Sequence, residues 1–307
     1  MVKLKNNLRF KRDIPFWLLA LPGIVYLLLF NYLPMIGLVL AFKRYNYIDG
    51  MIHSPWVEDV WENFRFFFNS VDATRVTVNT IGYNVIFIIT VNFSAVVMAL
   101  LLFEIHRRWV IKYVQTVMLL PYFISWVVVA YIFYSLLHPN YGVFNQIITA
   151  LGGKPILWYT EPKHWIWILP LANLWKNIGM NCLIVYAALM AIDISLFEAA
   201  ELDGAGRFRQ IIHVSLPSII PVMVILLILS VGGIMRGDFG LFYQVPMDTG
   251  LLYPTTDVID TFIYRGLREG NMSLGTAVGL FQSVVGLVMV LITNYIVRKI
   301  NPENSMF

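Results

Sequence analysis

Four polar residues lie in the otherwise apolar stretch 165–190. Asn173, Asn177 and Asn181 recur at every fourth position, so a helix places them on one face, and Lys176 lies one turn along beside them. Amide side chains both donate and accept hydrogen bonds, which suits a ligand rich in hydroxyl groups. The spacing therefore predicts a polar, ligand-binding helix face without a reacting group.

Groups that would support enzyme chemistry are missing from the sequence pattern. Cys182 is the only cysteine, and its place in the same apolar stretch is typical of a small packing residue. The five histidines are isolated and have no paired metal-ligand spacing. No phosphate loop, dinucleotide-binding GxGxxG or GxSxG motif occurs. We predict no catalytic residue, no metal site and no cofactor in this chain, which is therefore not an enzyme.

Hydrophobic stretches determine the fold class. The 307 residues are 59% hydrophobic and only 13% charged, about half the charge of a soluble domain. Of the 22 basic and 18 acidic residues, only Lys176 falls within six apolar windows, each longer than the ~20 residues that cross a bilayer. The sequence predicts an all-α, polytopic membrane protein with six transmembrane helices. The windows cover residues 16–42, 76–103, 113–137, 165–190, 214–235 and 272–297.

The position of Lys176 deep in a predicted membrane span limits what its side chain can face. A lysine deep in a span costs roughly 2.5–3.5 kcal/mol, so it should face a partner or a wet cavity rather than lipid. One hypothesis is that this face lines a translocation path, with Trp175 or Tyr186 supplying an apolar ring and Lys176 favouring an acidic or strongly hydroxylated solute. The alternative is that the asparagines bond to neighbouring helices and Lys176 pairs with an acid on a second chain.

The distribution of basic residues predicts the orientation. Segments that would lie on one side hold 12 basic residues in 57 positions, whereas the loops on the other side hold nine in 96. By the positive-inside rule both termini are cytoplasmic. The basic residues are scattered, which excludes nucleic-acid binding. The predicted organisation is a tail over 1–15, a first span with its external loop over 16–75, a core of five helices over 76–297 and a tail over 298–307.

The loop between the fourth and fifth windows, DISLFEAAELDGAGRFRQIIHVSLPSIIP, carries a further pattern. Ser195 and Glu198 form a capping box that starts a helix, and Gly204 and Gly206 end it. A second short helix is expected over Arg207–His213. This helix–turn–helix could dock into a groove of a soluble partner, or it could be an ordinary solvated connector.

The spacing of this loop resembles a known motif. It reads Glu198-Ala199-Ala200, three residues, Gly204, nine residues, Val214, one residue, Leu216-Pro217. Residues 194–217 are thereby similar to the EAA loop of ABC importer permeases, in which a valine here replaces the usual isoleucine. The first window and the segments NFRFFF, LLPYFISW and DVIDTFIYR resemble the oligosaccharide branch of this family.

The resemblance implies a fold, partners and a coupling site. It implies the type I ABC importer permease fold, paired with a second homologous permease subunit in the cell membrane. It also implies two cytoplasmic ATPase subunits that hold ATP and Mg²⁺, an external sugar-binding protein and an oligosaccharide substrate. The residues expected to contact the ATPase are Glu198, Ala199, Ala200, Asp203 and Gly204.

One alternative function and one question about helix packing remain open from the residues alone. A secondary, ion-coupled transporter of a small polar solute would favour buried acidic residues in its spans, and none of the six windows contains one. The small residues Gly275, Gly279, Ser283 and Gly286 form a stripe on the last window. This stripe suits close helix contact, either with a second permease or within this chain.

Overall fold

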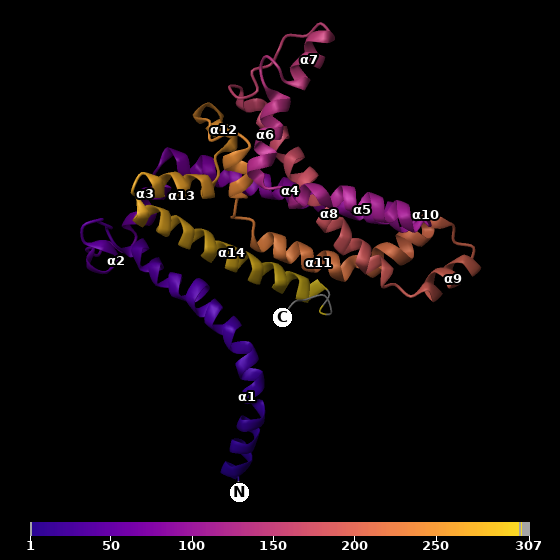
Figure 1. The fold of residues 1–307 in the computed structure, drawn as a ribbon, viewed down its shortest axis with the longest axis horizontal. Helices are drawn as coiled ribbons and strands as arrows, with labels where there is room; N and C mark the ends of the chain where they lie inside the picture. Colours follow the sequence, from indigo (N-terminus) through magenta and orange to yellow (C-terminus); the bar gives the residue numbers. More distant parts are fainter. Residues whose placement is uncertain (1, 301, 303–307) are drawn as a thin grey trace.

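The computed structural model describes residues 2–300 and 302, and this part of the chain is helical (Figure 1). It forms no β-strand there, although an isolated bridge joins Lys43 to Trp56. Five helical stretches are long and apolar enough to cross a membrane, and one bent helix pair makes a sixth candidate. The predicted all-α membrane architecture is confirmed.

The helices fall into three groups. The long helices are α1 (Val2–Leu27), α4 (Val71–Phe103), α5 (Arg108–Phe123), α6 (Trp126–Leu137), α8 (Trp165–Met190), α11 (Leu216–Gly232) and α14 (Met272–Ile300). Short α-helices are α2 (Gly50–His53), α3 (Glu62–Phe68), α7 (Val143–Ala150), α9 (Ile194–Leu202), α10 (Arg207–Gln210), α12 (Tyr253–Thr256) and α13 (Ile259–Arg268). Irregular helical segments are η1 (Leu28–Tyr32), η2 (Leu33–Phe42), η3 (Pro162–His164), η4 (Ile211–Ser215), η5 (Gly240–Gln244) and η6 (Gly250–Leu252).

The first span lies apart from the other helices along α1, whereas its end at η2 packs on α14, where Ala41 contacts the cluster of Phe64 and Ala277. α1 continues through η1 and η2 to Phe42, and its N-terminal part points away from the bundle (Figure 1). Only 6% of its most apolar window is buried. α1 begins at Val2, so residues 2–15 of the expected tail over 1–15 are helical and continuous with the first span. At the other end α14 extends to Ile300, and most of the expected tail over 298–307 lies outside the described residues.

The third apolar window is a broken helix. α5 and α6 meet at an angle of 98°. Pro121 has no N–H to donate, Ile124 is extended, and the Ser125 side chain accepts a hydrogen bond from the Val128 N–H at the start of α6. The bend sends α6 and α7 out of the bundle (Figure 1). It also leaves the last carbonyls of α5 without helical partners.

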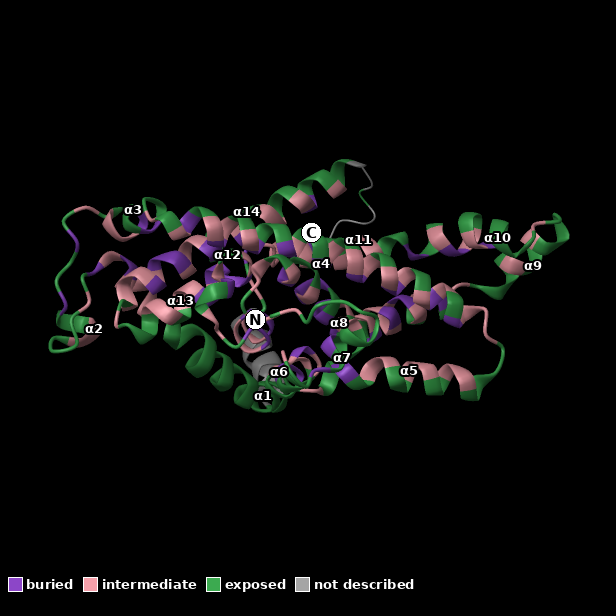
Figure 2. Ribbon diagram, turned by 90° about the horizontal axis from the view of Figure 1, so that it is seen from above, coloured by how far each residue is buried: buried purple, intermediate pink, exposed green. Residues whose placement is uncertain are grey.

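The core of the bundle forms along α4 and α8. Buried residues of α4 recur every three or four positions, as a helix that packs on one face requires. In α8, Gly179 faces the Met118 carbonyl of α5, and an added Cβ would collide with it. Cys182 is buried among apolar side chains of α4 and α8, which agrees with a packing role. Buried residues are concentrated along these inner helices (Figure 2).

A buried ion network holds the segment that precedes α13. The Asp257 side chain is 1% exposed and pairs with Arg75 of α4 at 3.0 Å and with Arg265 of α13. Arg265 also contacts Asp248 at 3.2 Å. Removing one partner of a buried pair leaves an uncompensated charge, so this network fixes the 236–258 segment against the start of α4.

The small-residue stripe of the last span is used within this chain. Space beside Gly275 and Gly279 is occupied by Ile263 of α13, and the Gly232 carbonyl of α11 closes the space beside Gly286. These close contacts support helix packing inside one subunit.

Candidate functional site

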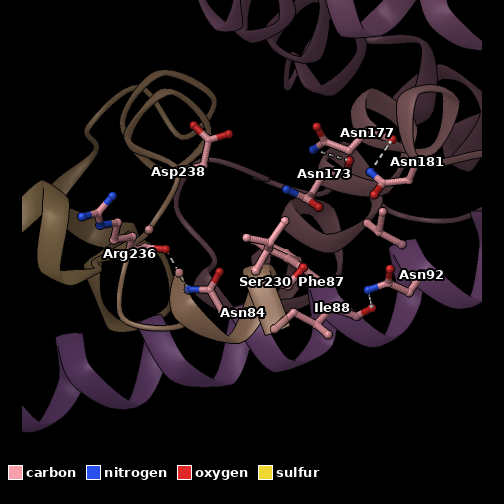
Figure 3. Close-up of a pocket in the computed structure, with 14 residues that line it drawn as sticks. Asn84, Phe87, Ile88, Asn92, Asn173, Asn177, Asn181, Ser230, Arg236 and Asp238 are labelled. Carbon is pink, nitrogen blue, oxygen red and sulfur yellow. Dashed lines mark hydrogen bonds between the residues drawn. The ribbon is translucent and has the colours of Figure 1, made fainter. Parts of the chain in front are cut away.

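A pocket of about 380 Å³ opens between α4, α8 and the end of α11 (Figure 3). Amide and apolar side chains alternate around it, and two charged residues lie at one edge. The lining residues are Asn84, Phe87, Ile88, Val91, Asn92, Asn173, Asn177, Asn181, Leu229, Ser230, Gly233, Arg236, Gly237 and Asp238. The term asparagine pocket refers to this set below.

The predicted asparagine face of α8 forms one wall of this pocket. Asn177 donates to the Asn173 carbonyl at 3.0 Å, and Asn181 donates to the Asn177 carbonyl at 3.1 Å. Each of these amides therefore uses one N–H on its own helix and retains its side-chain oxygen and a second N–H. The wall can both donate to and accept from a hydroxylated ligand.

Two asparagines of α4 face this wall and were missed by the sequence reasoning. Asn84 donates to the carbonyls of Ile234 and Arg236 at 3.0 and 2.9 Å, and Asn92 donates to the Ile88 carbonyl at 2.7 Å. Their spacing of eight residues within an apolar window is the same kind of signal that identified the α8 face.

The charged edge of the pocket is held by neighbouring elements. Asp238 accepts hydrogen bonds from Trp126 Nε1 at 2.8 Å and from the Leu241 N–H at 3.2 Å. The Arg236 side chain extends away from the three asparagines of α8 (Figure 3). In this loop region sequence spacing gives no periodic signal, so neither residue was predicted.

Asp260 of α13 fixes the same loop from behind. Its carboxylate accepts hydrogen bonds from the Gly237 N–H at 2.5 Å and from Gln282 Nε2 at 3.0 Å. Burial raises the pKa of the Asp260 carboxyl, while these two donors oppose the rise. The pocket edge is therefore anchored to both α13 and α14.

Lys176 lies beside the asparagine pocket but does not line it. Its side chain is buried, and Nζ donates to the carbonyls of Pro121 at 3.1 Å, Tyr122 at 3.0 Å and Ile124. Nζ is also 5.1 Å from the centre of the Trp126 ring. The lysine thus satisfies the carbonyls that the break between α5 and α6 sets free. Its partner is the backbone of this chain.

The two aromatic residues suggested for the path also lie elsewhere. Trp175 is on another face of α8 and is 40% exposed. Tyr186 packs partly buried beside Cys182, Val185 and Leu189. Neither residue lines the asparagine pocket.

The chemistry that the pocket can perform is binding. Amide oxygens and N–H groups match hydroxyl groups, and Phe87 and Ile88 supply apolar surface between them. Within the described residues, no group of three or more His, Cys, Asp and Glu side chains is arranged to hold a metal ion.

The loop after α8 forms a projecting helix with local caps. α9 starts after Asp193, whose carboxylate accepts from the Ser195 N–H at 3.0 Å. The expected capping box of Ser195 and Glu198 is therefore replaced by an aspartate cap two residues earlier. Hydrogen bonds from Ser195 lower the pKa of the Asp193 carboxyl.

The end of α9 requires a glycine. Gly204 has φ of +78°, and hydrogen bonds run from its N–H to the Glu201 carbonyl and from the Ala205 N–H to the Ala200 carbonyl. This pair of bonds is the Schellman arrangement, in which the residue at positive φ is usually glycine. The turn is open, because nothing lies within 4 Å of a Cβ added at Gly204.

The predicted coupling residues gather on an exposed surface. Glu198, Ala199, Asp203 and Gly204 are exposed and Ala200 is half-buried. The apolar side chains of Ile194, Leu202 and Phe208 are also exposed around them. The second helix expected over 207–213 is not separate, because α10 runs through η4 into α11 as one stretch over Arg207–Gly232.

The chain is similar to transport proteins over most of its length. Residues 91–302 match the family described as binding-protein-dependent transport system inner membrane component. Protein LplB of Bacillus subtilis is 35% identical over 95% of this chain and 91% of its own length. The B. subtilis polygalacturonan/rhamnogalacturonan transport system permease protein YteP is 34% identical over 94% of this chain and 88% of its own.

Solved structures agree with these similarities. A chain of a bacterial ABC transporter involved in the import of the acidic polysaccharide alginate superposes with a TM-score of 0.87 at 33% identity. The match covers 97% of this chain and 99% of that chain. A chain of the alginate transporter in complex with an alginate pentasaccharide-bound periplasmic protein gives a TM-score of 0.85 at 33% identity, covering 95% and 96%.

Proposed function

The chain belongs to the family of binding-protein-dependent transport system inner membrane components, and on that premise we propose that it carries an oligosaccharide through the asparagine pocket. It is a multi-pass membrane permease. The observation that carries the proposal is the polar wall of Asn173, Asn177 and Asn181 facing Asn84 and Asn92. The side-chain oxygens and second N–H groups that Asn177 and Asn181 retain match the hydroxyl donors and acceptors of a sugar.

The names of the relatives support an oligosaccharide as the class of substrate. YteP is named for polygalacturonan and rhamnogalacturonan, and the superposed structure belongs to an alginate importer. Neutral and acidic oligosaccharides both carry hydroxyl groups, which the amide side chains of the pocket can contact.

We further propose that the pocket is completed by a second homologous permease. The pocket lies open on one side of this chain. Trp126 at the start of α6 bonds to Asp238 at the pocket edge, and α6 and α7 project from the bundle (Figure 1). A sugar path needs walls on all sides, so a second subunit supplies the missing one. A stable, transport-competent assembly that contains this permease alone would contradict the pairing.

The α9 surface is the proposed contact with a cytoplasmic ATPase. Exposed Ile194 and Leu202 flank the acidic residues Glu198 and Asp203, so the surface offers both apolar contact and orienting charge. ATP and Mg²⁺ bind to two such ATPase subunits, and the sugar is delivered by an external binding protein.

We propose that both termini lie in the cytoplasm, on the same side of the membrane as the α9 surface. A cysteine introduced at the exposed Asn140 should react with an impermeant reagent from outside intact cells, and one at Gly206 should not. Labelling of Gly206→Cys from outside would overturn the orientation.

Uptake by the whole complex tests the function. The chain, its second permease and the ATPases are reconstituted with the binding protein, and maltotetraose, tetragalacturonate and an alginate tetrasaccharide are supplied. We expect uptake of at least one sugar that needs internal ATP and resists ionophores. Uptake without ATP that an ionophore abolishes would instead identify an ion-coupled transporter.

A further inference from the structure

A second pocket, of about 260 Å³, lies between α6 and the end of η5. Its polar and aromatic walls come from Tyr131, Tyr243, Gln244 and Asp248, with Met247 beside them. We propose that this pocket, called the outer subsite below, binds one pyranose ring of the transported oligosaccharide. The inference rests on the proposed oligosaccharide transport and adds a second binding station to it.

The aromatic walls suit the apolar face of a sugar ring. The Tyr131 side chain is 64% exposed, and within the described residues neither its ring nor its hydroxyl has a partner. Tyr243 is fixed by stacking on Phe239, with ring centres 4.8 Å apart and planes at 17°. An aromatic face is electron-rich and attracts the C–H groups on one side of a pyranose.

The polar walls suit the hydroxyl groups of the same ring. Gln244 makes no side-chain hydrogen bond within the described residues, so its amide is free to donate and accept. Asp248 Oδ1 accepts from Arg265 Nη1 at 3.2 Å and from the Tyr253 hydroxyl at 3.0 Å. These donors hold the carboxylate and offset its charge, which leaves Oδ2 to accept a sugar hydroxyl.

The backbone at this pocket is strained. Met247 and Asp248 both adopt positive φ, 56° and 44°, although neither is glycine. Consecutive residues of this kind are costly and persist where the surrounding structure enforces them, which happens preferentially at ligand sites. Here the strained pair turns Asp248 toward Arg265 and the pocket.

The outer subsite and the asparagine pocket are connected by the chain segment 236–248 and by the start of α6. Residues 236–238 line the asparagine pocket, and Tyr243, Gln244, Met247 and Asp248 line the outer subsite a few residues later. Trp126 at the start of α6 bonds to Asp238, and Tyr131 lies little more than one turn further along α6. One chain segment and the Trp126–Asp238 bond thus connect the two pockets, so a sugar chain that passes through could contact them in succession.

Uptake kinetics of the reconstituted complex test this subsite. Tyr131→Ala removes the ring, Tyr131→Phe keeps it, and Gln244→Leu removes the free amide. The control is Tyr141→Ala, which removes a tyrosine that is 77% exposed and lines neither pocket. Each variant is measured with whichever tetrasaccharide the unaltered complex imports, and assembly with the second permease is checked by size-exclusion chromatography.

The subsite predicts a change in KM rather than in maximal rate. Loss of one aromatic contact should raise KM roughly three- to ten-fold in Tyr131→Ala. Gln244→Leu should act in the same direction, and Tyr131→Phe, which keeps the ring, should raise KM less than Tyr131→Ala does. Tyr141→Ala, outside both pockets, should transport normally. Equal KM in Tyr131→Ala and the unaltered complex would overturn the subsite alone. Loss of the second permease from Tyr131→Ala would also overturn it, by assigning this wall to the partner subunit. Import of no oligosaccharide by the unaltered complex would overturn the proposed function and the subsite together.

Discussion

The caps of α9 are local, whereas several polar contacts in and beside the asparagine pocket join distant parts of the chain, alongside the i−4 bonds of Asn92, Asn177 and Asn181. In the loop, Asp193 caps the N–H of Ser195 two residues away, and the Ala205 N–H reaches a carbonyl five residues back. Beside the pocket, Lys176 bonds to carbonyls 52 to 55 residues away. Asn84 reaches carbonyls 150 and 152 residues away.

This difference predicts which parts of the fold a substitution in each region will destabilise. A change in the loop should alter one projecting surface and leave the bundle intact. A change at Lys176 of α8 should loosen the bend between α5 and α6, because its partners come from a different helix. The predictions below test this contrast, beginning with the largest expected effect.

Lys176→Met should give the largest loss. It removes the donor for the carbonyls of Tyr122 and Ile124, and each buried acceptor left unmet costs roughly 1–3 kcal/mol. The Pro121 carbonyl also loses the lysine but still accepts from the Ile124 N–H at 3.2 Å. We expect little folded complex and a lower melting temperature, measured by fluorescence-detected size-exclusion chromatography after heating.

Two further variants separate this effect from a path role. Lys176→Arg keeps donors near the bend and should recover part of the folded complex, whereas Trp175→Leu on an exposed face of α8 should behave normally. Normal stability of Lys176→Met combined with altered preference between acidic and neutral sugars would contradict the stabilising role of Lys176 at the α5–α6 break and favour the path role.

Gly204→Leu should uncouple transport without unfolding the bundle. A side chain at positive φ costs roughly 1–2 kcal/mol, enough to displace the end of α9 and to lower ATP-driven uptake about ten-fold. Gly206→Leu is a matched control, because Gly206 has φ of −70° and equally open surroundings. Equal uptake by both variants would show that the turn does not position the coupling surface.

Asn177→Leu should weaken sugar transport by a smaller factor. It removes one amide from the pocket wall, and a single hydrogen bond is worth about 1 kcal/mol, so KM should rise roughly five-fold at unchanged assembly. Met180→Leu on the same helix lies outside the pocket and serves as the control. An unchanged KM for Asn177→Leu would remove this wall from the path.

The same contrast explains how much the sequence could predict. Apolar windows located the spans closely, and the window 165–190 coincides with α8. The asparagine face of α8 followed from a spacing of four, and Asn84 and Asn92 could have been found in the same way. The partner of Lys176 could not, because its three carbonyls become available only through the 98° bend between α5 and α6.

Local chemistry also misled the sequence reasoning in one place. Ser195 and Glu198 satisfy the capping-box pattern, yet the chain uses Asp193 as the cap. Two overlapping caps compete over a single turn, and the aspartate bonds to the Ser195 N–H itself. Positions of helix ends within such a loop therefore depend on which of several short-range bonds forms.

Asp193→Ala should have the smallest effect, confined to the loop. Without the cap the first turn of α9 should fray, seen as faster amide hydrogen exchange over 194–197, while α8 and the bundle exchange as before. Asp193→Asn is the matched control, since asparagine caps equally well. Bonds from Ser195 lower the pKa of the Asp193 carboxyl in the folded loop. The ionised carboxylate therefore stabilises the start of α9 fully at neutral pH, and this stabilisation is lost as the pH falls through the lowered pKa. If exchange also accelerated across α8 in Asp193→Ala, the loop and the bundle would be one cooperative unit, and the contrast between local and long-range polar contacts would fail.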